Sequence, residues 1–280
     1  MSSHAKAGKL PGMHIAHPAQ PLPRLRPRQY ALAIFRIARL AFHLLKGLWL
    51  TRSQFAQRPQ AERNELLQGW SRHLLNILDI RVRERGLHDN AELHTAGRLI
   101  VANHISWLDI FVINSSSPCR FVAKSEIRHW PLIGKLVTFA GTLYIERGSR
   151  RATSHAKKEI DGHLKAGDCV AFFPEGTTTD GSTLKPFRGG LIQSALDHGI
   201  IIQPVLLQYR SKNGQRSMAA AYIDEVSLLS CIWQLACEPY TVAELDYLSP
   251  RCGLPESRKE ITRLIEQEMR HSMQHPDSAL

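Results

Sequence analysis

Residues 99–110 read LIVANHISWLDI, which begins as a continuous apolar run and then turns polar. The expected strand, 98–102, is short and mostly apolar, as strands buried on both faces of a sheet are. His104 follows it, and Asp109 stands five residues later, after a helical pattern has begun near Trp107. We therefore expect a strand, a turn with an ionisable imidazole, and a helix, which is where α/β sheets carry their sites.

The spacing of His104 and Asp109 governs whether their side chains can meet. In a continuous helix, five residues would place them about 140° apart, so contact requires that His104 precede the helix and Asp109 lie in its first turn. A buried carboxylate on one ring nitrogen would then set the tautomer and leave the other nitrogen free as a base. The alternative is a capping box, Ser106-x-x-Asp109, in which Asp109 only satisfies amides at the helix end.

Short apolar runs alternate with helical patterns from Ile80 onward. The expected strands are 80–84, 98–102, 120–123, 142–145, 168–173 and 201–208. The expected helices are 107–114, 131–139, 149–165, 189–198, 228–237 and 255–273. Strands separated by helices predict a layered α/β domain, which we expect to cover residues 80–280.

The net charge of +11 is concentrated at the N-terminal end of the chain. Residues 1–61 contain ten Lys and Arg and no Asp or Glu, whereas the other 219 residues carry 26 basic and 25 acidic residues. A basic end favours an anionic partner, either a membrane or a nucleic acid. Residues 1–29, with five prolines, are expected to form a disordered tail. A signal peptide is not predicted, because the first apolar run starts only at Tyr30.

The segment 30–50, YALAIFRIARLAFHLLKGLWL, is strongly apolar but contains four basic residues: Arg36, Arg39, His43 and Lys46. Their spacing places them within an arc of about 80° of a helix. Crossing a bilayer would cost about 2.5–3.5 kcal/mol for each charge near its centre, whereas an interfacial helix lets a basic stripe meet lipid phosphates. An ordinary amphipathic helix on a soluble core is the alternative. With a second amphipathic helix at 61–79, residues 30–79 are expected to form an interfacial pair.

The stretch CVAFFPEGTTTDGS, residues 169–182, repeats the layout of a strand followed by polar groups. The apolar strand ends at Pro174, and Glu175, Gly176 and Thr177 come next. Side-chain oxygens and backbone amides at such a strand end can receive a polyol or a phosphate. A polar loop without a ligand is the alternative interpretation.

Two further strand or helix boundaries carry arginine. Arg147 stands just past the expected strand 142–145, and a guanidinium there matches the geometry of a phosphate. Arg188 and Gly189 lead into the expected helix 189–198, where free amides and a cation suit an anion. A surface charge cluster and a routine helix entry are the respective alternatives.

Several other chemistries lack their sequence patterns. The chain has no G-x-S-x-G elbow, no G-x-x-x-x-G-K-[ST] loop, no G-x-G-x-x-G and no H-E-x-x-H. Its five cysteines are scattered without a C-x-x-C pair, so neither a zinc site nor a disulfide framework is indicated. Only the basic end favours nucleic acid, without an aromatic-basic surface to support it. We expect no metal, no cofactor and no nucleic-acid partner.

Four blocks occur in an order that resembles the phospholipid/glycerol acyltransferase family. They are N-H-x4-D at 103–109, G-x-x-[FY]-[IV]-x-R at 141–147, F-P-E-G-T at 173–177 with F-R-G-G at 187–190, and an apolar strand with proline at 202–205. The resemblance runs from about residue 80 to about residue 210. It implies an acyltransferase domain with a mixed sheet flanked by helices, held at a membrane by the N-terminal helix pair.

The resemblance also implies roles for individual residues. His104 would be the general base that deprotonates an acceptor hydroxyl, and Asp109 would orient it. The residues implied to bind the acceptor and its phosphate are Arg147, Glu175, Gly176, Thr177, Arg188 and Gly189. Acyl-CoA or an acyl carrier protein would be the co-substrate. The expected location is the cytoplasmic face of the inner membrane, on an anionic surface.

Thr178 departs from the family pattern, because members that acylate lysophosphatidic acid usually have arginine after E-G-T. The leading interpretation is transfer to 1-acyl-sn-glycerol-3-phosphate, giving phosphatidic acid. Threonine-rich versions resemble enzymes that acylate lyso-ornithine lipid or other lysophospholipids, which is the first alternative. The second is a non-catalytic lipid-binding protein on the same fold.

Overall fold

A seven-stranded sheet runs through the middle of the part of the chain that the computed structural model describes, namely residues 26–52, 55–86, 97–130, 133–146, 150–223, 226–252 and 257–275. Residues 1–25 of the expected tail 1–29 lie outside these residues, and so does Arg147. The strands are β1 (Ile80–Gly86), β2 (Arg98–Ala102), β3 (Arg120–Lys124), β4 (Leu143–Ile145), β5 (Cys169–Phe172), β6 (Ile201–Ser211) and β7 (Thr241–Tyr247).

The sheet is mixed. Its order is β1-β7-β6-β2-β5-β3-β4, and every neighbouring pair is parallel except β6 and β7. This confirms the expected α/β fold with a mixed sheet. Strand β7 was not expected, because its sequence TVAELDY carries polar residues, although all but one of its residues are buried. The buried Asp246 is satisfied by Arg85 of the neighbouring β1, at 2.7 Å.

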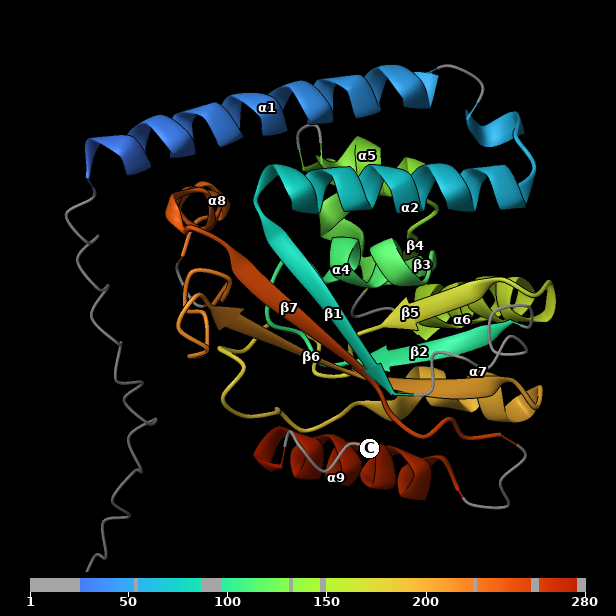
Figure 1. Ribbon diagram of the computed structural model, residues 1–280. Coiled ribbons are helices and arrows are strands. Elements are labelled where there is room, and N and C mark those ends of the chain that lie inside the picture. The colour runs from blue at the N-terminus through green and yellow to red at the C-terminus, as the bar shows by residue number, and fades with distance from the viewer. Residues whose placement is uncertain are drawn as a thin grey trace, which may run out of the picture.

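Helices cover both faces of the sheet (Figure 1). They are α1 (Pro27–Arg52), α2 (Gln60–Ile77), α4 (Asp109–Ser116), α5 (Ile133–Phe139), α6 (Arg150–Lys165), α7 (Ile192–Asp197), α8 (Leu228–Cys237) and α9 (Arg258–Gln274), with 3-10 turns η1 (Phe55–Gln57), η2 (Ser125–His129) and η3 (Gly189–Leu191). One apolar core joins the sheet to α1, α2, α4 and α8, and a second joins it to α6, α7 and α9. Helices α1 and α9 therefore lie on opposite sides of the molecule.

Strand β2 lies at the centre of the sheet, between β5 and β6, and all five of its residues are buried. Because β2 is parallel to β5, the carboxyl ends of these two strands meet, with Val101 paired to Phe172, while β6 pairs with β2 through Pro204 and continues past its end to Ser211. The segments that follow β2 and β5, which carry His104 and Glu175, therefore emerge side by side.

Two of the four basic residues of α1 face the protein, whereas Arg39 and Lys46 are exposed. Arg36 is buried and donates hydrogen bonds to the carbonyl oxygens of Ala236, Glu238 and Pro239. His43 is also buried, bonds to the carbonyl of Trp70 and stacks on its ring. Burial lowers the pKa of His43 to about 4, so this side chain is neutral at physiological pH. The prediction that Arg36 and His43 face lipid phosphates is wrong.

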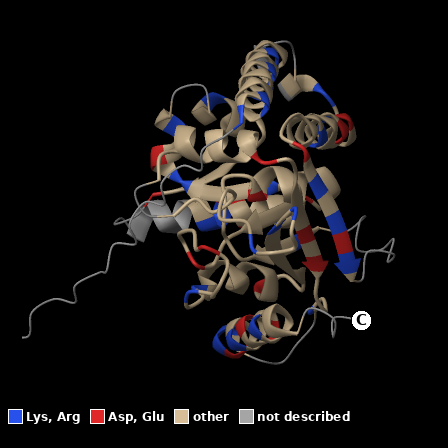
Figure 2. Ribbon diagram, turned by 60° about the vertical axis from the view of Figure 1, so that its left-hand side comes forward, with Lys and Arg blue, Asp and Glu red and all other residues tan. Residues whose placement is uncertain are grey.

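The outer side of α1 is apolar instead. We use the term α1 apolar face for its exposed large side chains, Tyr30, Leu32, Ile34, Phe35, Phe42, Leu45 and Trp49. Exposed Arg39 and Lys46 flank this face. In Figure 2, α1 is the helix at the top, mostly tan with a few basic positions. No helix among the described residues is both long and apolar enough to cross a bilayer.

Candidate active site

His104 and Asp109 meet in the turn between β2 and α4. The Nδ1 atom of His104 lies 2.7 Å from Oδ2 of Asp109. His104 precedes the helix and Asp109 is its first residue, so the five-residue spacing does not follow helical geometry. The Asp109 carboxylate folds back over the turn. This is the arrangement that the sequence spacing requires for a contact between His104 and Asp109.

The Asp109 carboxylate is completely buried and has four hydrogen-bonding partners. Besides His104, its Oδ2 accepts from the backbone N–H groups of Ile105 and Ser106, at 2.8 and 3.0 Å. Its Oδ1 accepts from the hydroxyl of Tyr209, at 2.7 Å. The bond from the Ser106 N–H fulfils half of the predicted capping box; the hydroxyl of Ser106 has no partner among the described residues. Asp109 therefore caps the turn and holds the imidazole at once.

Tyr209 belongs to this site although the sequence did not indicate it. It lies on β6, a hundred residues from Asp109, and is 2 % exposed. Burial and the neighbouring carboxylate raise the pKa of its hydroxyl well above the ordinary value, so the group stays a donor. The available signal was a hydroxyl-bearing ring directly after the expected strand 201–208, which β6 extends to Ser211.

The other side of the His104 ring faces an aromatic side chain and solvent. The ring stacks on Phe173, with centroids 4.0 Å apart and planes 6° apart. The His104 side chain is 22 % exposed. Because a carboxylate only accepts hydrogen bonds, Nδ1 carries the proton in the neutral ring and Nε2 keeps its lone pair. No described residue hydrogen-bonds to Nε2, so this arrangement can accept a proton from a hydroxyl group.

Asn103 ties the start of the turn to β6. Its side-chain amide donates to the carbonyl oxygen of Leu207 at 3.0 Å and accepts from the Leu207 N–H at 2.7 Å. The amide thus mimics one more residue of sheet pairing beyond the end of β2. Asn103 is fully buried, and its two bonds hold the backbone just before His104.

Glu175 braces the same turn from the side of β5. One carboxylate oxygen accepts from the N–H of His104 and the other from the N–H of Lys185, both at 2.8 Å. The side chain is buried, and this burial raises the pKa of its carboxyl group while the two backbone bonds oppose the rise. The structure therefore brings Glu175 to His104, with each of its oxygens already bonded to the backbone.

The threonines after Gly176 line the loop beside the His104 turn. The N–H of Thr179 donates to the carbonyl oxygen of His104 at 2.8 Å. The hydroxyl of Thr178 donates to the carbonyl oxygen of Tyr222, and the Tyr222 N–H in turn donates to Ile105. Thr177 is exposed. At the position where a cation was expected, the side chain is therefore a neutral group engaged with the backbone.

Arg188 and Gly189 lie farther along the same loop. The N–H of Arg188 donates to the carbonyl oxygen of Pro174 at 2.9 Å, and its side chain is exposed. Gly189 packs against α9 so closely that a Cβ atom there would lie 1.9 Å from the hydroxyl oxygen of Thr262. Gly189 also lines a cavity between η3 and α9. Among the described residues, no group of three or more His, Cys, Asp or Glu side chains is placed to hold a metal.

Comparison with known proteins places the chain in a family. A family model described as Acyltransferase matches residues 81–208. A 1-acyl-sn-glycerol-3-phosphate acyltransferase of Neisseria meningitidis is 36% identical over 213 residues, which cover 76% of this chain and 82% of that protein. A lyso-ornithine lipid O-acyltransferase of Pseudomonas aeruginosa is 35% identical over 208 residues, covering 74% and 78% of the two chains.

A solved structure shares the fold. The crystal structure of the 1-acyl-sn-glycerophosphate acyltransferase PlsC from Thermotoga maritima matches with a TM-score of 0.65, at 18% identity, over 90% of this chain and 97% of that one. The Neisseria relative is similar enough in sequence, and over enough of both chains, to show common family membership and not only a shared fold. The chain therefore belongs to the acyltransferase family and is an enzyme similar to the 1-acyl-sn-glycerol-3-phosphate acyltransferases.

Proposed function

We propose that this protein is a membrane-associated O-acyltransferase that transfers a fatty acyl group from a thioester donor, acyl-CoA or acyl carrier protein, to the free hydroxyl of a lyso-lipid. The observation that carries the proposal is the 2.7 Å contact between His104 and the buried Asp109, with Nε2 of the ring left available. Together with the family membership, this arrangement favours catalysis over lipid binding without activity.

In the proposed reaction, Nε2 of His104 takes the proton of the acceptor hydroxyl as its oxygen attacks the thioester carbonyl. Asp109 stabilises the imidazolium that forms. The carbon–sulfur bond then breaks, and the imidazolium returns the proton to the leaving thiolate. Hydroxyl and thioester become ester and thiol, no acyl-enzyme is formed, and His104 is neutral again.

We further propose 1-acyl-sn-glycerol-3-phosphate as the acceptor and phosphatidic acid as the product. The Neisseria relative is named for this activity, and Arg147 and Arg188 are the residues proposed to meet the phosphate. Lyso-ornithine lipid is a second candidate, because Thr178 supplies no cation and the Pseudomonas relative is named for that acceptor.

The acceptor is tested with purified protein, a radiolabelled acyl donor and each lyso-lipid supplied separately, with thin-layer separation of the products. We expect faster formation of phosphatidic acid than of ornithine lipid. The reverse ranking would assign the enzyme to lyso-ornithine lipid. Turnover of neither acceptor would contradict both proposals.

The α1 apolar face supports membrane association, at the cytoplasmic face of the inner membrane in our proposal. Its seven large side chains are exposed, on a helix that lies at the outside of the molecule (Figure 1). Burying a large apolar side chain contributes about 1.5–3 kcal/mol, so several together can hold the protein in the outer part of a bilayer. Arg39 and Lys46, at the flank of this face, are placed to meet lipid phosphates.

The double substitution Phe42→Glu/Trp49→Glu is expected to release the protein from membranes. It removes two of the exposed rings and adds two charges that resist burial in lipid, so partitioning should fall about 100-fold or more. The measurement is cosedimentation with vesicles of phosphatidylethanolamine and phosphatidylglycerol. The matched control, Phe42→Leu/Trp49→Leu, keeps the face apolar and should still sediment. Retention of the Glu variant in the pellet would place the anchor elsewhere.

Glu175→Gln separates two roles for this side chain, positioning of the His104 turn and contact with the acceptor. A glutamine can accept from only one of the two N–H groups, so the turn should loosen and kcat should fall about 10- to 100-fold with acceptor KM nearly unchanged. Steady-state kinetics measures the changes in kcat and KM separately, with Glu159→Gln, at an exposed position of α6, as the control. A raised acceptor KM at unchanged kcat would instead assign Glu175 to acceptor binding.

A further inference from the structure

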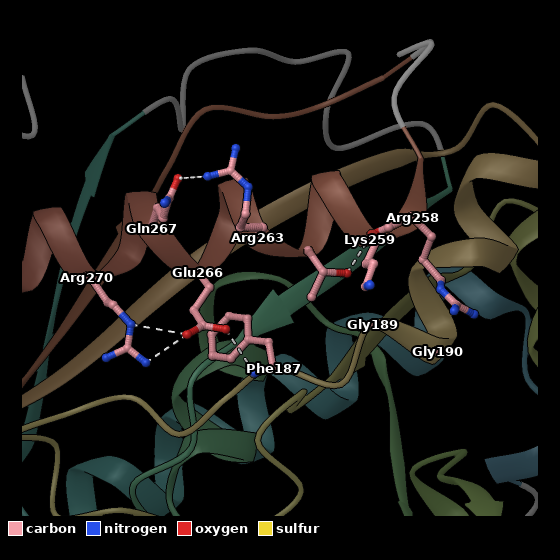
Figure 3. A pocket seen from close by; sticks show the side chains of 10 residues that line it. Phe187, Gly189, Gly190, Arg258, Lys259, Arg263, Glu266, Gln267 and Arg270 are labelled. Carbon is pink, nitrogen blue, oxygen red and sulfur yellow. Dashed lines mark hydrogen bonds and ion pairs between the residues drawn. The ribbon is translucent and has the colours of Figure 1, made fainter.

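A basic cavity lies between η3 and α9, on the opposite side of the molecule from α1 (Figures 1 and 3). It has a volume of about 590 Å³, which is within the range of about 300–1,000 Å³ typical of small-molecule sites. Its wall carries four cationic side chains, Arg258, Lys259, Arg263 and Arg270, and one carboxylate, Glu266. The excess of positive charge suits an anionic ligand.

Two of these cations have no acidic partner among the described residues. Arg270 pairs with Glu266 at 2.8 Å, and Arg263 pairs with Glu260, whereas Arg258 and Lys259 are exposed without an ion pair. They are also the first two residues of α9, where the helix dipole disfavours positive charge. Their position therefore does not stabilise the helix, and binding of an external anion would account for it.

The cavity is joined to the His104 turn by a short chain of contacts. On α9, Glu266 accepts from the N–H of Phe187 at 3.0 Å, and Arg270 donates to the carbonyl oxygen of Leu184 at 2.8 Å. Between these two residues, the N–H of Lys185 bonds to Glu175, which also holds the N–H of His104. One loop thus has the cavity on one side and the brace of the histidine on the other.

We propose that this cavity binds the 3′-phospho-AMP portion of a coenzyme A thioester, so that the acyl donor enters from the side opposite the α1 apolar face. This inference rests on the proposed acyltransferase function. Arginine and lysine side chains form charge-assisted hydrogen bonds with phosphate oxygens, and the concave shape fits a nucleotide better than the surface of a carrier protein. The flexible pantetheine arm would run along the loop that carries Phe187 towards His104.

The experiment compares the full-length protein with Arg258→Ala/Lys259→Ala and with a charge-matched control, Lys158→Ala/Lys165→Ala, whose side chains are exposed on α6 outside the cavity. Each is assayed with palmitoyl-CoA, with palmitoyl-phosphopantetheine, which lacks the nucleotide, and with palmitoyl-acyl carrier protein. We expect the double variant to raise the KM for palmitoyl-CoA about tenfold or more. It should thereby lose the preference of the unmodified enzyme for palmitoyl-CoA over palmitoyl-phosphopantetheine.

Calorimetric binding of free coenzyme A to the same proteins keeps this inference separate from the proposed function. Binding that is lost in Arg258→Ala/Lys259→Ala but kept in the control supports the cavity even if no acceptor is turned over. Turnover of palmitoyl-CoA with equal KM in all three proteins overturns the cavity and leaves the function standing. An equal rise in KM for palmitoyl-CoA and palmitoyl-phosphopantetheine, or exclusive use of the carrier protein, also overturns it.

Discussion

Replacing His104 with alanine is expected to lower kcat/KM by about 10³-fold or more while the protein stays folded. A positioned general base contributes about 10²–10⁴-fold to a reaction, and no other described group is placed to replace Nε2. The side chain is partly exposed, and Asp109 would keep its bonds to two backbone amides and to Tyr209. The measurement is initial rate with saturating donor, together with circular dichroism and thermal unfolding.

The chain offers a matched control for this substitution. His163 and Asp168 have the same five-residue spacing, and Nδ1 of His163 lies 2.8 Å from Oδ2 of Asp168. This second pair lies at the amino end of β5, whereas His104 follows the carboxyl end of β2, which is parallel to β5. His163→Ala should therefore keep kcat/KM within about twofold. Equal activity of the His104 and His163 variants would refute the base assignment.

Asp109→Asn is expected to lower kcat about 10³–10⁴-fold, comparable to the effect of removing the charge from other His–Asp pairs. The amide is nearly isosteric, but it lacks the charge that stabilises an imidazolium and can turn its NH₂ group towards the ring. The proton would then move to Nε2, which could no longer accept one. Stability should also fall by about 1–3 kcal/mol, because the buried carboxylate now satisfies four donors.

Both effects of Asp109→Asn have direct measurements. Single-turnover kinetics reports the rate of acyl transfer, and thermal unfolding reports stability. Asp168→Asn serves as the control, since it removes a carboxylate from the other His–Asp pair and should leave the acyl-transfer rate unchanged. A fall in stability without a fall in rate would restrict Asp109 to the capping role that the Ser106-x-x-Asp109 pattern also predicts.

Local sequence patterns predicted most of the strands and helices, because the formation of a strand or helix depends largely on residues that are neighbours in the sequence. The apolar runs ended close to the observed ends of β2 and β5, and the helical pattern at 228–237 coincides with α8. Strand β7 was missed because its polar side chains find partners on other strands, as Asp246 does with Arg85. The periodicity of α1 indicated an amphipathic helix, but not that Arg36 and His43 would be buried against backbone carbonyl groups of α8, its following loop and α2.

Contacts between distant segments could not be predicted in the same way. Asn103 and Leu207, and Asp109 and Tyr209, are about a hundred residues apart and meet only because β2 pairs with β6 in one register. Glu175 reaches the N–H of His104 because β5 is the other neighbour of β2. A single sequence records these side chains but not the strand order that brings them together.

The pattern H-x4-D shows what the sequence determines and what depends on the tertiary structure. It occurs at 104–109 and again at 163–168, and in both places the imidazole meets the carboxylate. Sequence order and the accompanying blocks singled out the first, and they predicted the family and the residue types of the candidate site. The sheet separates the two pairs physically: His104 follows the carboxyl end of a central parallel strand, beside groups from β5 and β6, whereas Asp168 precedes the amino end of β5. Reactivity depends on which groups converge around the imidazole, and that convergence comes from strand pairing.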